Sequence, residues 1–370
     1  METVSLLLTP ADVTMFRDTR PFDQVPTGAR SLLPSPRTAA GAIRTWALRT
    51  RHPHDFAKLR GKATTPARVK EVMGQAAAWI TEARFAGPFL HRYGNTFWPA
   101  PLSVVRLDGD PRPRQLRPLV KPPPGWVLPA STPDLKPLWA TGVGEAEPLA
   151  GLLDNQGMAR FLHCQCDQLV ETDTDRVWRH EPRIGIGVDS GRGAVESGAL
   201  YGSSFLRLEQ GVAFRVDVTS GQGLRAELEQ AVLKRPWLRL GGEGKVAGIS
   251  LLQEQPALPT APAWPPRDGR FCTYLATPAR FEGGSWLPRA LMAKHTLISA
   301  VVGRPEAVPG WDVASGRPLP TAYAVPAGAV YYWEVRDQSA TDPHGLSISD
   351  NADDQAVGWG ICMRGEWDYV

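Results

Sequence analysis

The sequence is poor in cysteine and has no long apolar run, and each absence narrows the class of protein. Its 370 residues include only four cysteines, Cys164, Cys166, Cys272 and Cys362. Their number and spacing do not fit the disulfide framework of a small secreted protein. No stretch of 18 apolar residues occurs, and no charged-then-apolar leader follows Met1. We therefore expect a cytoplasmic protein with neither a membrane span nor a membrane partner.

Signatures of common catalytic sites are also missing. The chain has no His-Glu-x-x-His motif, no Gly-x-Ser-x-Gly motif and no pair of carboxylates at catalytic spacing. His163, Cys164 and Cys166 lie close together, but Cys-x-Cys lacks the two-residue spacer of common zinc sites and no second cysteine pair follows. The sequence therefore predicts no catalytic residue, no metal and no cofactor. For His163, Cys164 and Cys166 the alternatives are core packing, a free thiol and a metal site.

Charge is unevenly distributed along the chain. The net charge is only +3, yet residues 1–130 hold 19 Lys and Arg against 9 Asp and Glu, a balance of +10. Residues 131–370 hold 22 against 29, a balance of −7. A basic part and an acidic part suit a protein that meets a polyanion on one side and other proteins on the other. The alternative is a chance clustering of surface charges.

Five of these 19 basic residues lie in residues 16–44, which read FRDTRPFDQVPTGARSLLPSPRTAAGAIR. They are Arg17, Arg20, Arg30, Arg37 and Arg44. Ser35 is a favourable N-cap for a predicted helix over residues 36–50. Free backbone N–H groups at such a helix start attract an anion, and Arg37 and Thr38 lie beside them. The stretch therefore predicts a site for the phosphates of a nucleic-acid backbone.

A second candidate phosphate site is the glycine-rich loop Gly241-Gly242-Glu243-Gly244-Lys245. Glycines let the backbone approach a ligand closely and expose N–H groups to phosphate oxygens. The loop is not a Walker A motif, which would need glycine in place of Arg239 and serine or threonine in place of Val246. The alternative is a tight turn beside an edge strand.

The predicted elements of the first part follow the order strand, helix, two strands, helix, strand. The strands are Val4–Leu8, Ala199–Leu208, Val212–Val218 and Val246–Leu251, and the helices are 36–50 and Gly223–Leu233. The second and third strands are expected to pair as a hairpin through Glu209-Gln210-Gly211. This is the ferredoxin-like order, with residues 51–180 inserted after the first helix. We place the first domain at residues 1–252.

The residue patterns that predict helices and strands are weaker in the insertion and the second domain than in the rest of the first domain. Within 51–180, helices are predicted over residues 66–84 and near Met158–Leu169, and the proline-rich stretch from Gly87 to Leu138 is expected to pack loosely. The segment 255–266 reads as a linker. A second domain, 267–370, has predicted strands near Arg270–Thr277, His295–Val302, Ala329–Val335 and Trp359–Met363.

Four blocks of the sequence together resemble one known family. They are F-R-D-x-R-P-F with P-S-P-x-T-x-x-G-A-I-R in residues 16–44, R-I-G-I with G-A-V-E-S-G-A-L-Y in 183–208, L-G-G-E-G-K in 240–245, and the tail 358–367. The chain resembles the third subunit of Cmr-type (type III-B) CRISPR effector complexes, a group within the RAMP superfamily. This resemblance implies an α+β fold of two ferredoxin-like (RRM-like) domains, here with a long proline-rich insertion in the first.

The resemblance also implies a function. The subunit would be non-catalytic, would bind the 5′ handle of the CRISPR guide RNA, and would bridge the large polymerase-like or cyclase-like subunit to the backbone RAMP subunits. Glu243 is expected to brace its loop while the backbone meets RNA. Carried onto this sequence, the residues that face RNA are Arg17, Arg20, Ser35, Arg37, Thr38, Arg44, Gly241, Gly242, Gly244 and Lys245.

Two other functions compete with this one. A RAMP endoribonuclease that processes CRISPR precursor RNA would use His295 or His54 in acid–base chemistry. A scaffold that contacts only protein would leave residues 16–44 away from RNA.

Overall fold

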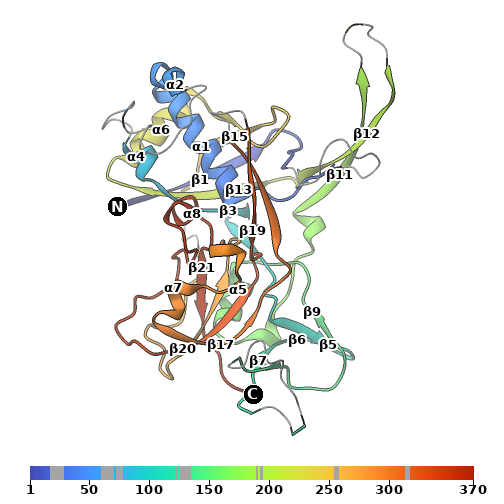
Figure 1. Cartoon of the computed structure of the whole chain (residues 1–370), viewed down its shortest axis with the longest axis vertical. Helices are drawn as coiled ribbons and strands as arrows, with labels where there is room; N and C mark the ends of the chain where they lie inside the picture. The colour runs from blue at the N-terminus through green and yellow to red at the C-terminus, as the bar shows by residue number, and fades with distance from the viewer. Residues whose placement is uncertain are drawn as a thin grey trace. The chain divides into compact units, whose positions relative to one another are not determined.

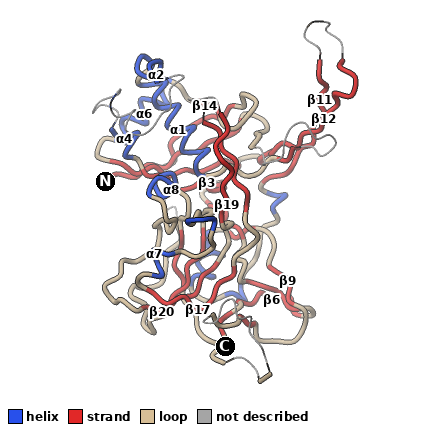
Figure 2. Tube along the Cα trace, viewed as in Figure 1, coloured by secondary structure: helices blue, strands red, loops and turns tan. Residues whose placement is uncertain are grey.

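The computed structural model describes residues 1–16, 29–59, 71, 78–121, 124–125, 135–188, 191, 195–253, 258–312 and 317–370. The fold is a mixed α/β fold with several antiparallel sheets and few helices, and Figure 2 shows strands predominating over helices. The chain divides into two compact units. The first comprises Met1–Pro88, Asp175–Glu254 and Ala307–Ala322, and the second comprises Phe89–Thr174, Gln255–Glu306 and Tyr323–Val370. None of the described helices is long and apolar enough to span a membrane.

The first unit is built on an antiparallel sheet around β1 (Glu2–Pro10). Its strands lie in the order β3-β13-β1-β15-β14 and comprise β3 (Arg84–Arg92), β13 (Val212–Ser220), β15 (Val246–Leu251) and β14 (Trp237–Arg239). Val4, Leu6 and Leu8 are fully buried at every second position of β1, as expected for a strand with one face on the core. Figure 1 shows the helices α1 (Pro36–Arg51) and α6 (Leu224–Lys234) beside this sheet, and α6 contacts both β1 and β15.

Helix α1 confirms the prediction from local signals. Ser35 is its N-cap, with the Ser35 Oγ accepting a hydrogen bond from the Thr38 N–H at 3.3 Å, and Pro36 occupies the first turn. One face of α1 is buried, with Ala39, Ala40, Ile43, Trp46, Ala47 and Leu48 inside. The short helices α2 (Pro53–Leu59) and α4 (Ala78–Glu82) follow. Most of the helix predicted over 66–84 lies outside the described residues.

The predicted hairpin between residues 199–208 and 212–218 is wrong. Strand β12 (Val195–Leu208) pairs instead with β11 (Trp178–Val188) and with the short β2 (Ala29–Arg30). Figure 1 shows β11 and β12 as a long ribbon that extends away from the sheet of the first unit. Strand β13 is buried on both faces, which requires a position inside a sheet, and β3 is its neighbour opposite β1. The sequence interval predicted as an insertion therefore supplies a strand of the first sheet.

The second unit contains a four-stranded antiparallel sheet in the order β17-β20-β16-β21. Its strands are β16 (Arg270–Leu275), β17 (His295–Val301), β20 (Val330–Val335) and β21 (Cys362–Gly365). The first three confirm predicted strands, and the fourth, predicted at Trp359–Met363, begins three residues later. Helix α7 (Arg289–Met292) lies between β16 and β17 in the chain, and α8 (Ala352–Val357) lies between β20 and β21. Phe271, Tyr331 and Trp333 are fully buried in its core.

The expectation of a loosely packed proline-rich stretch is wrong. Trp98 is fully buried, and its Nε1–H donates to Asn155 Oδ1 at 3.0 Å, while the Tyr274 hydroxyl donates to the Pro99 carbonyl at 2.7 Å. Prolines fit because Pro111 and Pro113 lie on an edge strand, where a missing N–H breaks no ladder. The strands of this region are β4 (Asn95–Pro99), β5 (Val104–Leu107), β6 (Asp110–Gln115), β7 (Arg117–Pro118), β8 (Leu138–Trp139), β9 (Ala146–Pro148) and β10 (Leu152–Leu153).

The remaining elements are short. Helix α5 (Asn155–Leu162) confirms the helix predicted near Met158, and a single 3-10 turn at Cys166–Gln168 follows it. Strands β18 (Glu306–Asp312) and β19 (Arg317–Ala324) form a two-stranded sheet among the described residues.

Candidate nucleic-acid interface

The glycine-rich loop lies against the residues that begin the arginine-rich stretch. The Gly242 N–H donates to the Met15 carbonyl at 2.8 Å. Gly241 has φ +82°, and a Cβ added there would lie 2.6 Å from the Met15 carbonyl oxygen and 3.0 Å from the Phe16 ring. Only glycine allows this approach. The loop is therefore held directly beside the residues that precede Arg17.

Ser31 and Leu32, further along the arginine-rich stretch, also contact Phe16. The Leu32 N–H donates to the Phe16 carbonyl at 2.9 Å, and the Phe16 N–H donates to Ser31 Oγ at 2.9 Å. Ser31 and Leu32 therefore lie beside Phe16, which contacts the glycine loop. The predicted site residues Arg17 and Arg20 lie outside the described residues, so only the ends of their segment are placed.

The loop itself presents backbone to solvent. Gly241, Gly242, Glu243 and Gly244 are exposed, and Glu243 and Gly244 both have left-handed backbone conformations, with φ +55° and +68°. The Leu240 N–H donates to the Lys245 carbonyl at 2.9 Å and closes the turn. The Lys245 ammonium lies 4.9 Å from the centre of the Phe205 ring. No hydrogen bond or ion pair of the Glu243 side chain occurs in the described part of the chain, so the expected bracing role has no contact to support it.

The start of α1 offers fewer free donors than its sequence predicts. The Thr38 N–H donates to Ser35 Oγ, the Ala39 N–H donates to the Ser35 carbonyl at 3.2 Å, and Pro36 has no N–H. The hydroxyl groups of Ser35 and Thr38 lie 3.0 Å apart and bond to each other. An anion at this helix start would therefore depend on the Arg37 guanidinium and the helix dipole.

Arg44 lies further along α1 than Ser35, Arg37 and Thr38. It lies nine residues after Ser35 on α1, a rise of about 14 Å along the helix. Its Nη2 donates to the Ala83 carbonyl at 3.3 Å, and its guanidinium lies 4.9 Å from the centre of the Phe85 ring. These contacts tie Arg44 to the beginning of β3.

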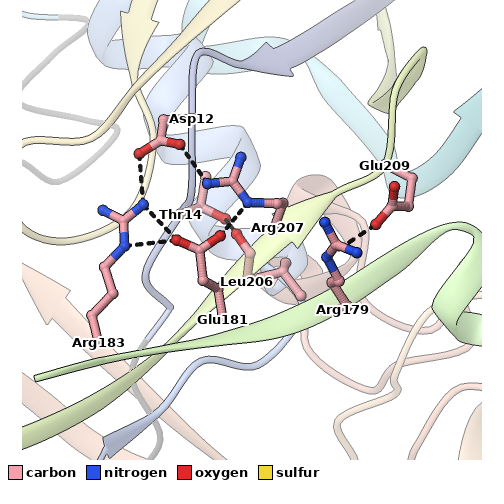
Figure 3. Close-up of polar contacts among 8 residues, drawn as sticks. All are labelled: Asp12, Thr14, Arg179, Glu181, Arg183, Leu206, Arg207 and Glu209. Atoms are coloured by element: carbon pink, nitrogen blue, oxygen red, sulfur yellow. Dashed lines mark hydrogen bonds and ion pairs between the residues drawn. The ribbon is translucent and has the colours of Figure 1, made fainter.

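A network of four charges fixes the segment that carries Met15 and Phe16, and sequence reasoning missed it. Figure 3 shows the Asp12 carboxylate between Arg183 and Arg207, at 3.0 and 2.8 Å. Glu181 joins the same two arginines, with an Arg183 contact of 2.7 Å and a close contact to Arg207 Nε. Two backbone hydrogen bonds between Thr14 and Leu206, at 2.8 and 2.9 Å, complete the attachment to β12. Strands β11 and β12 and the glycine-rich loop thus all contact the segment of residues 12–16.

The two arginines change the acid–base behaviour of both carboxylates. Hydrogen bonds from Arg183 and then Arg207 lower the pKa of Asp12 from its ordinary 3.8 to about 2, against the opposing effect of desolvation. Hydrogen bonds from Arg207 and then Arg183 lower the pKa of Glu181 to about 2. Both carboxylates therefore stay ionised at any pH at which the protein works.

Replacing Asp12 with asparagine tests this attachment. Because the Asp12 pKa is lower in the folded chain than in the unfolded one, its contribution to stability is complete above about pH 4 and is lost as the pH falls toward 2. The Asp12 side chain is half exposed, so D12N should reduce the free energy of unfolding by no more than about 1 kcal/mol at pH 7. Urea unfolding of both proteins should show this difference shrink near pH 2. The exposed Asp108, changed to asparagine, serves as the control; an equal loss in D108N would contradict the assignment.

The histidine of the competing nuclease function lies in the core. His295 is only 2% exposed, and its ring centre lies 4.8 Å from that of Phe271 and 6.2 Å from that of Trp264. Burial lowers the pKa of His295 below its ordinary value. An imidazole in this position does not reach an RNA substrate. His54, on α2, is exposed.

Three of the four cysteines are buried thiols, and Cys164 is exposed. Cys166, Cys272 and Cys362 are buried, and burial raises the pKa of each. The Cys164 thiol donates to the Glu366 carbonyl at 2.9 Å. Within the described ranges, no three His, Cys, Asp or Glu side chains are grouped as metal ligands would be.

Comparison with known proteins gives a family and a set of similar folds. The model of a family described as CRISPR-associated protein (Cas_Cmr3) matches residues 6–367. No curated protein matches the sequence. A chain in the cryo-EM structure of the type III-B Cmr-beta bound to cognate target RNA is similar, with 15% identity and a TM-score of 0.48 over 89% of this chain and 86% of that one. A chain of the Csm3-Csm4 subcomplex in the type III-A CRISPR-Cas interference complex has 9% identity and a TM-score of 0.42, over 97% and 98% of the two chains.

Proposed function

This chain belongs to the Cas_Cmr3 family of CRISPR-associated proteins, and from that membership we propose that it is the subunit of a type III-B effector complex that holds the 5′ handle of the guide RNA. A type III CRISPR effector subunit of this family works beside RNA and other subunits, so its surfaces must serve both. The arrangement of the residues indicates which surface binds the sugar–phosphate backbone.

One observation supports the RNA site above all others. Met15 and Phe16, which precede Arg17, contact Gly241 and Gly242. Leu32, which follows Arg30, bonds to Phe16. The two parts of the sequence that suit phosphates are therefore neighbours in space. Guanidinium groups and backbone N–H groups are the donors with which proteins bind phosphate oxygens. We assign the RNA backbone to this neighbourhood, with Arg17, Arg20, Arg37, Lys245 and the loop glycines as its contacts.

The strand order of both sheets supports a fold of two ferredoxin-like domains. Taking β1, β3, β13 and β15 as the first to fourth strands, the order across the first sheet is 2-3-1-4. The four strands of the second sheet, β16, β17, β20 and β21, have the same order, again with a helix after the first and the third strand. This arrangement is the ferredoxin-like one. We propose that the domains span 1–252 and 267–370. The proline-rich insertion, at about 51–180, interrupts the first domain in sequence, and its part Phe89–Thr174 belongs to the second compact unit.

We also propose a non-catalytic role and two protein partners. The burial of His295 supports the absence of nuclease activity, and the excess of acidic residues after position 130 suits contacts with neighbouring subunits. The partners would be the large polymerase-like or cyclase-like subunit and a backbone RAMP subunit. Incubation of the chain with labelled repeat RNA without metal should leave the RNA intact. Discrete cleavage that disappears in H54A would contradict this proposal.

Reversing the charge of Arg37 tests the RNA site. Loss of a phosphate contact should weaken binding of a guide RNA with a repeat-derived 5′ end about tenfold at 0.1 M salt, and should reduce the slope of log K against log salt by about 1. Filter binding of labelled RNA over a salt series measures both quantities. R267E is the matched control, because Arg267 is exposed and lies in the second unit. Equal retention of RNA by wild type and R37E would count against the site.

A further inference from the structure

Glu243 stands in a conformation that favours glycine. Its φ is +55°, in the left-handed region, where a Cβ raises the free energy of the backbone. Gly241 and Gly244, on either side, have φ of +82° and +68°. A glycine at position 243 would therefore fit the turn better, and the turn itself does not explain a glutamate there.

Among the described residues, the carboxylate of Glu243 has no partner that explains it either. The residue is exposed, and in the described part of the chain its side chain takes part in no hydrogen bond or ion pair. Lys245, two residues on, directs its ammonium at the Phe205 ring at 4.9 Å. The loop is held by backbone groups, through Gly242 and Met15 and through Leu240 and Lys245.

A carboxylate at this position also opposes the binding of phosphates. It repels them, so a loop that served only the RNA backbone would bind better with glycine or glutamine at this position. What a carboxylate can do is accept hydrogen bonds with two oxygens at once. In single-stranded RNA the donors are the ribose 2′-hydroxyl, which offers one hydrogen, and the exposed edges of the bases, which can offer two side by side.

Only one base has a matching edge. Guanine presents the N1–H and the N2 amino group side by side, so both carboxylate oxygens accept a hydrogen bond. Adenine and cytosine each place one amino group next to a ring nitrogen that also accepts, and uracil places one N–H between two carbonyls. Opposite these three bases, at least one carboxylate oxygen faces another acceptor.

The surroundings of the loop suit a base as well as a phosphate. Leu32, whose N–H bonds to the Phe16 carbonyl, is 41% exposed, and Leu33 is 39% exposed. Exposed leucines next to Phe16 offer an apolar surface close to the loop, and the face of a base is apolar.

We propose that Glu243 is a specificity-determining residue that recognises a guanine of the bound RNA through its Watson–Crick edge. The N1–H and the N2 amino group of the base donate to the two carboxylate oxygens. This inference rests on the proposed function, because it needs an RNA strand held beside the glycine-rich loop.

Selection from a random RNA pool tests the proposal. The full-length wild-type chain, E243Q and E243G are each incubated with labelled single-stranded RNA of twelve random nucleotides, and the retained RNA is sequenced. Wild type should favour guanine at one position by roughly 5- to 150-fold over the other bases, as expected for a bidentate base contact. E243Q and E243G should lose this preference while still retaining RNA. E229Q, which removes an exposed carboxylate on α6, should keep the preference.

Each other outcome has a distinct meaning. If E243Q and E243G bind all RNAs more tightly by one factor and keep the wild-type base preference, Glu243 only repels phosphate and the proposal is wrong. Enrichment of a different base by wild type overturns it as well. If wild type retains no RNA above background at low salt, the RNA site itself is wrong. E243G guards against misfolding, since glycine suits the φ of this position.

Discussion

Replacing Gly241 with alanine should destabilise the chain by about 2–4 kcal/mol and abolish binding of guide RNA. The new Cβ would meet the Met15 carbonyl oxygen at 2.6 Å, and the backbone φ of +82° adds its own cost. The loop must move away from Met15, which breaks the hydrogen bond from the Gly242 N–H. Thermal unfolding and filter binding of labelled RNA measure the two losses.

Gly244 provides the matched control for this substitution. Its φ is +68°, but a Cβ added there would meet no atom within 4 Å. G244A should therefore cost only the conformational strain, about 1 kcal/mol, and should retain RNA within a few-fold of wild type. Similar losses of stability in G241A and G244A would show that the contact with Met15 contributes nothing.

Replacing Arg364 with methionine should destabilise the second unit by about 3–5 kcal/mol. The Arg364 side chain is only 3% exposed. Its guanidinium donates to both carboxylate oxygens of Asp342, at 2.8 and 2.9 Å, and to the backbone carbonyls of Pro262 and Ala263, at 2.6 and 3.3 Å. Methionine fills a similar volume but leaves all four acceptors without this donor. The midpoint of urea unfolding measures the effect.

A surface pair serves as the control for Arg364. Arg289 and Glu282 form an ion pair at 2.8 Å, with side chains 64% and 73% exposed, so R289M should change stability by less than about 1 kcal/mol. Equal effects of R364M and R289M would contradict the buried role of Arg364.

The loss in R364M should also depend on pH. Burial by itself would raise the pKa of Asp342, but hydrogen bonds from Arg364 and the His344 N–H, with the Arg364 charge, lower it below its ordinary value. The stabilising contribution is therefore present above the ordinary pKa of an aspartate and is lost as the pH falls through the lower value of the folded state. The difference between wild type and R364M should narrow in acid.

Features encoded by neighbouring residues could be predicted from the sequence. Ser35, Pro36 and the apolar spacing after them predicted α1, and the runs of apolar residues at 270–277 and 329–335 predicted β16 and β20. Each of these signals lies within one element. For the same reason the turn at Gly241–Gly244 was recognisable as a loop whose backbone can approach a partner.

Features that depend on distant residues could not be predicted. Strand β13 is buried on both faces and therefore needs a neighbouring strand on each side. No local pattern in residues 84–92 identifies β3, rather than β12, as one of these neighbours. Asp12 meets arginines that are 171 and 195 residues away in the sequence. The contact between Gly242 and Met15 is similar: glycine predicts a close approach but does not name the partner.

The position of β1 inside its sheet, between β13 and β15, has a consequence for synthesis of the chain. Its register with β13 pairs Glu2 with Ser220, and its pairing with β15 joins Leu6 to Leu251. At about 5–20 residues per second, a ribosome needs roughly 10–50 s to make the partners of a strand that has already emerged. During that interval both edges of an apolar strand are open. Newly made chains should therefore depend on chaperones that shield the N-terminal strand until residue 251 has left the ribosome.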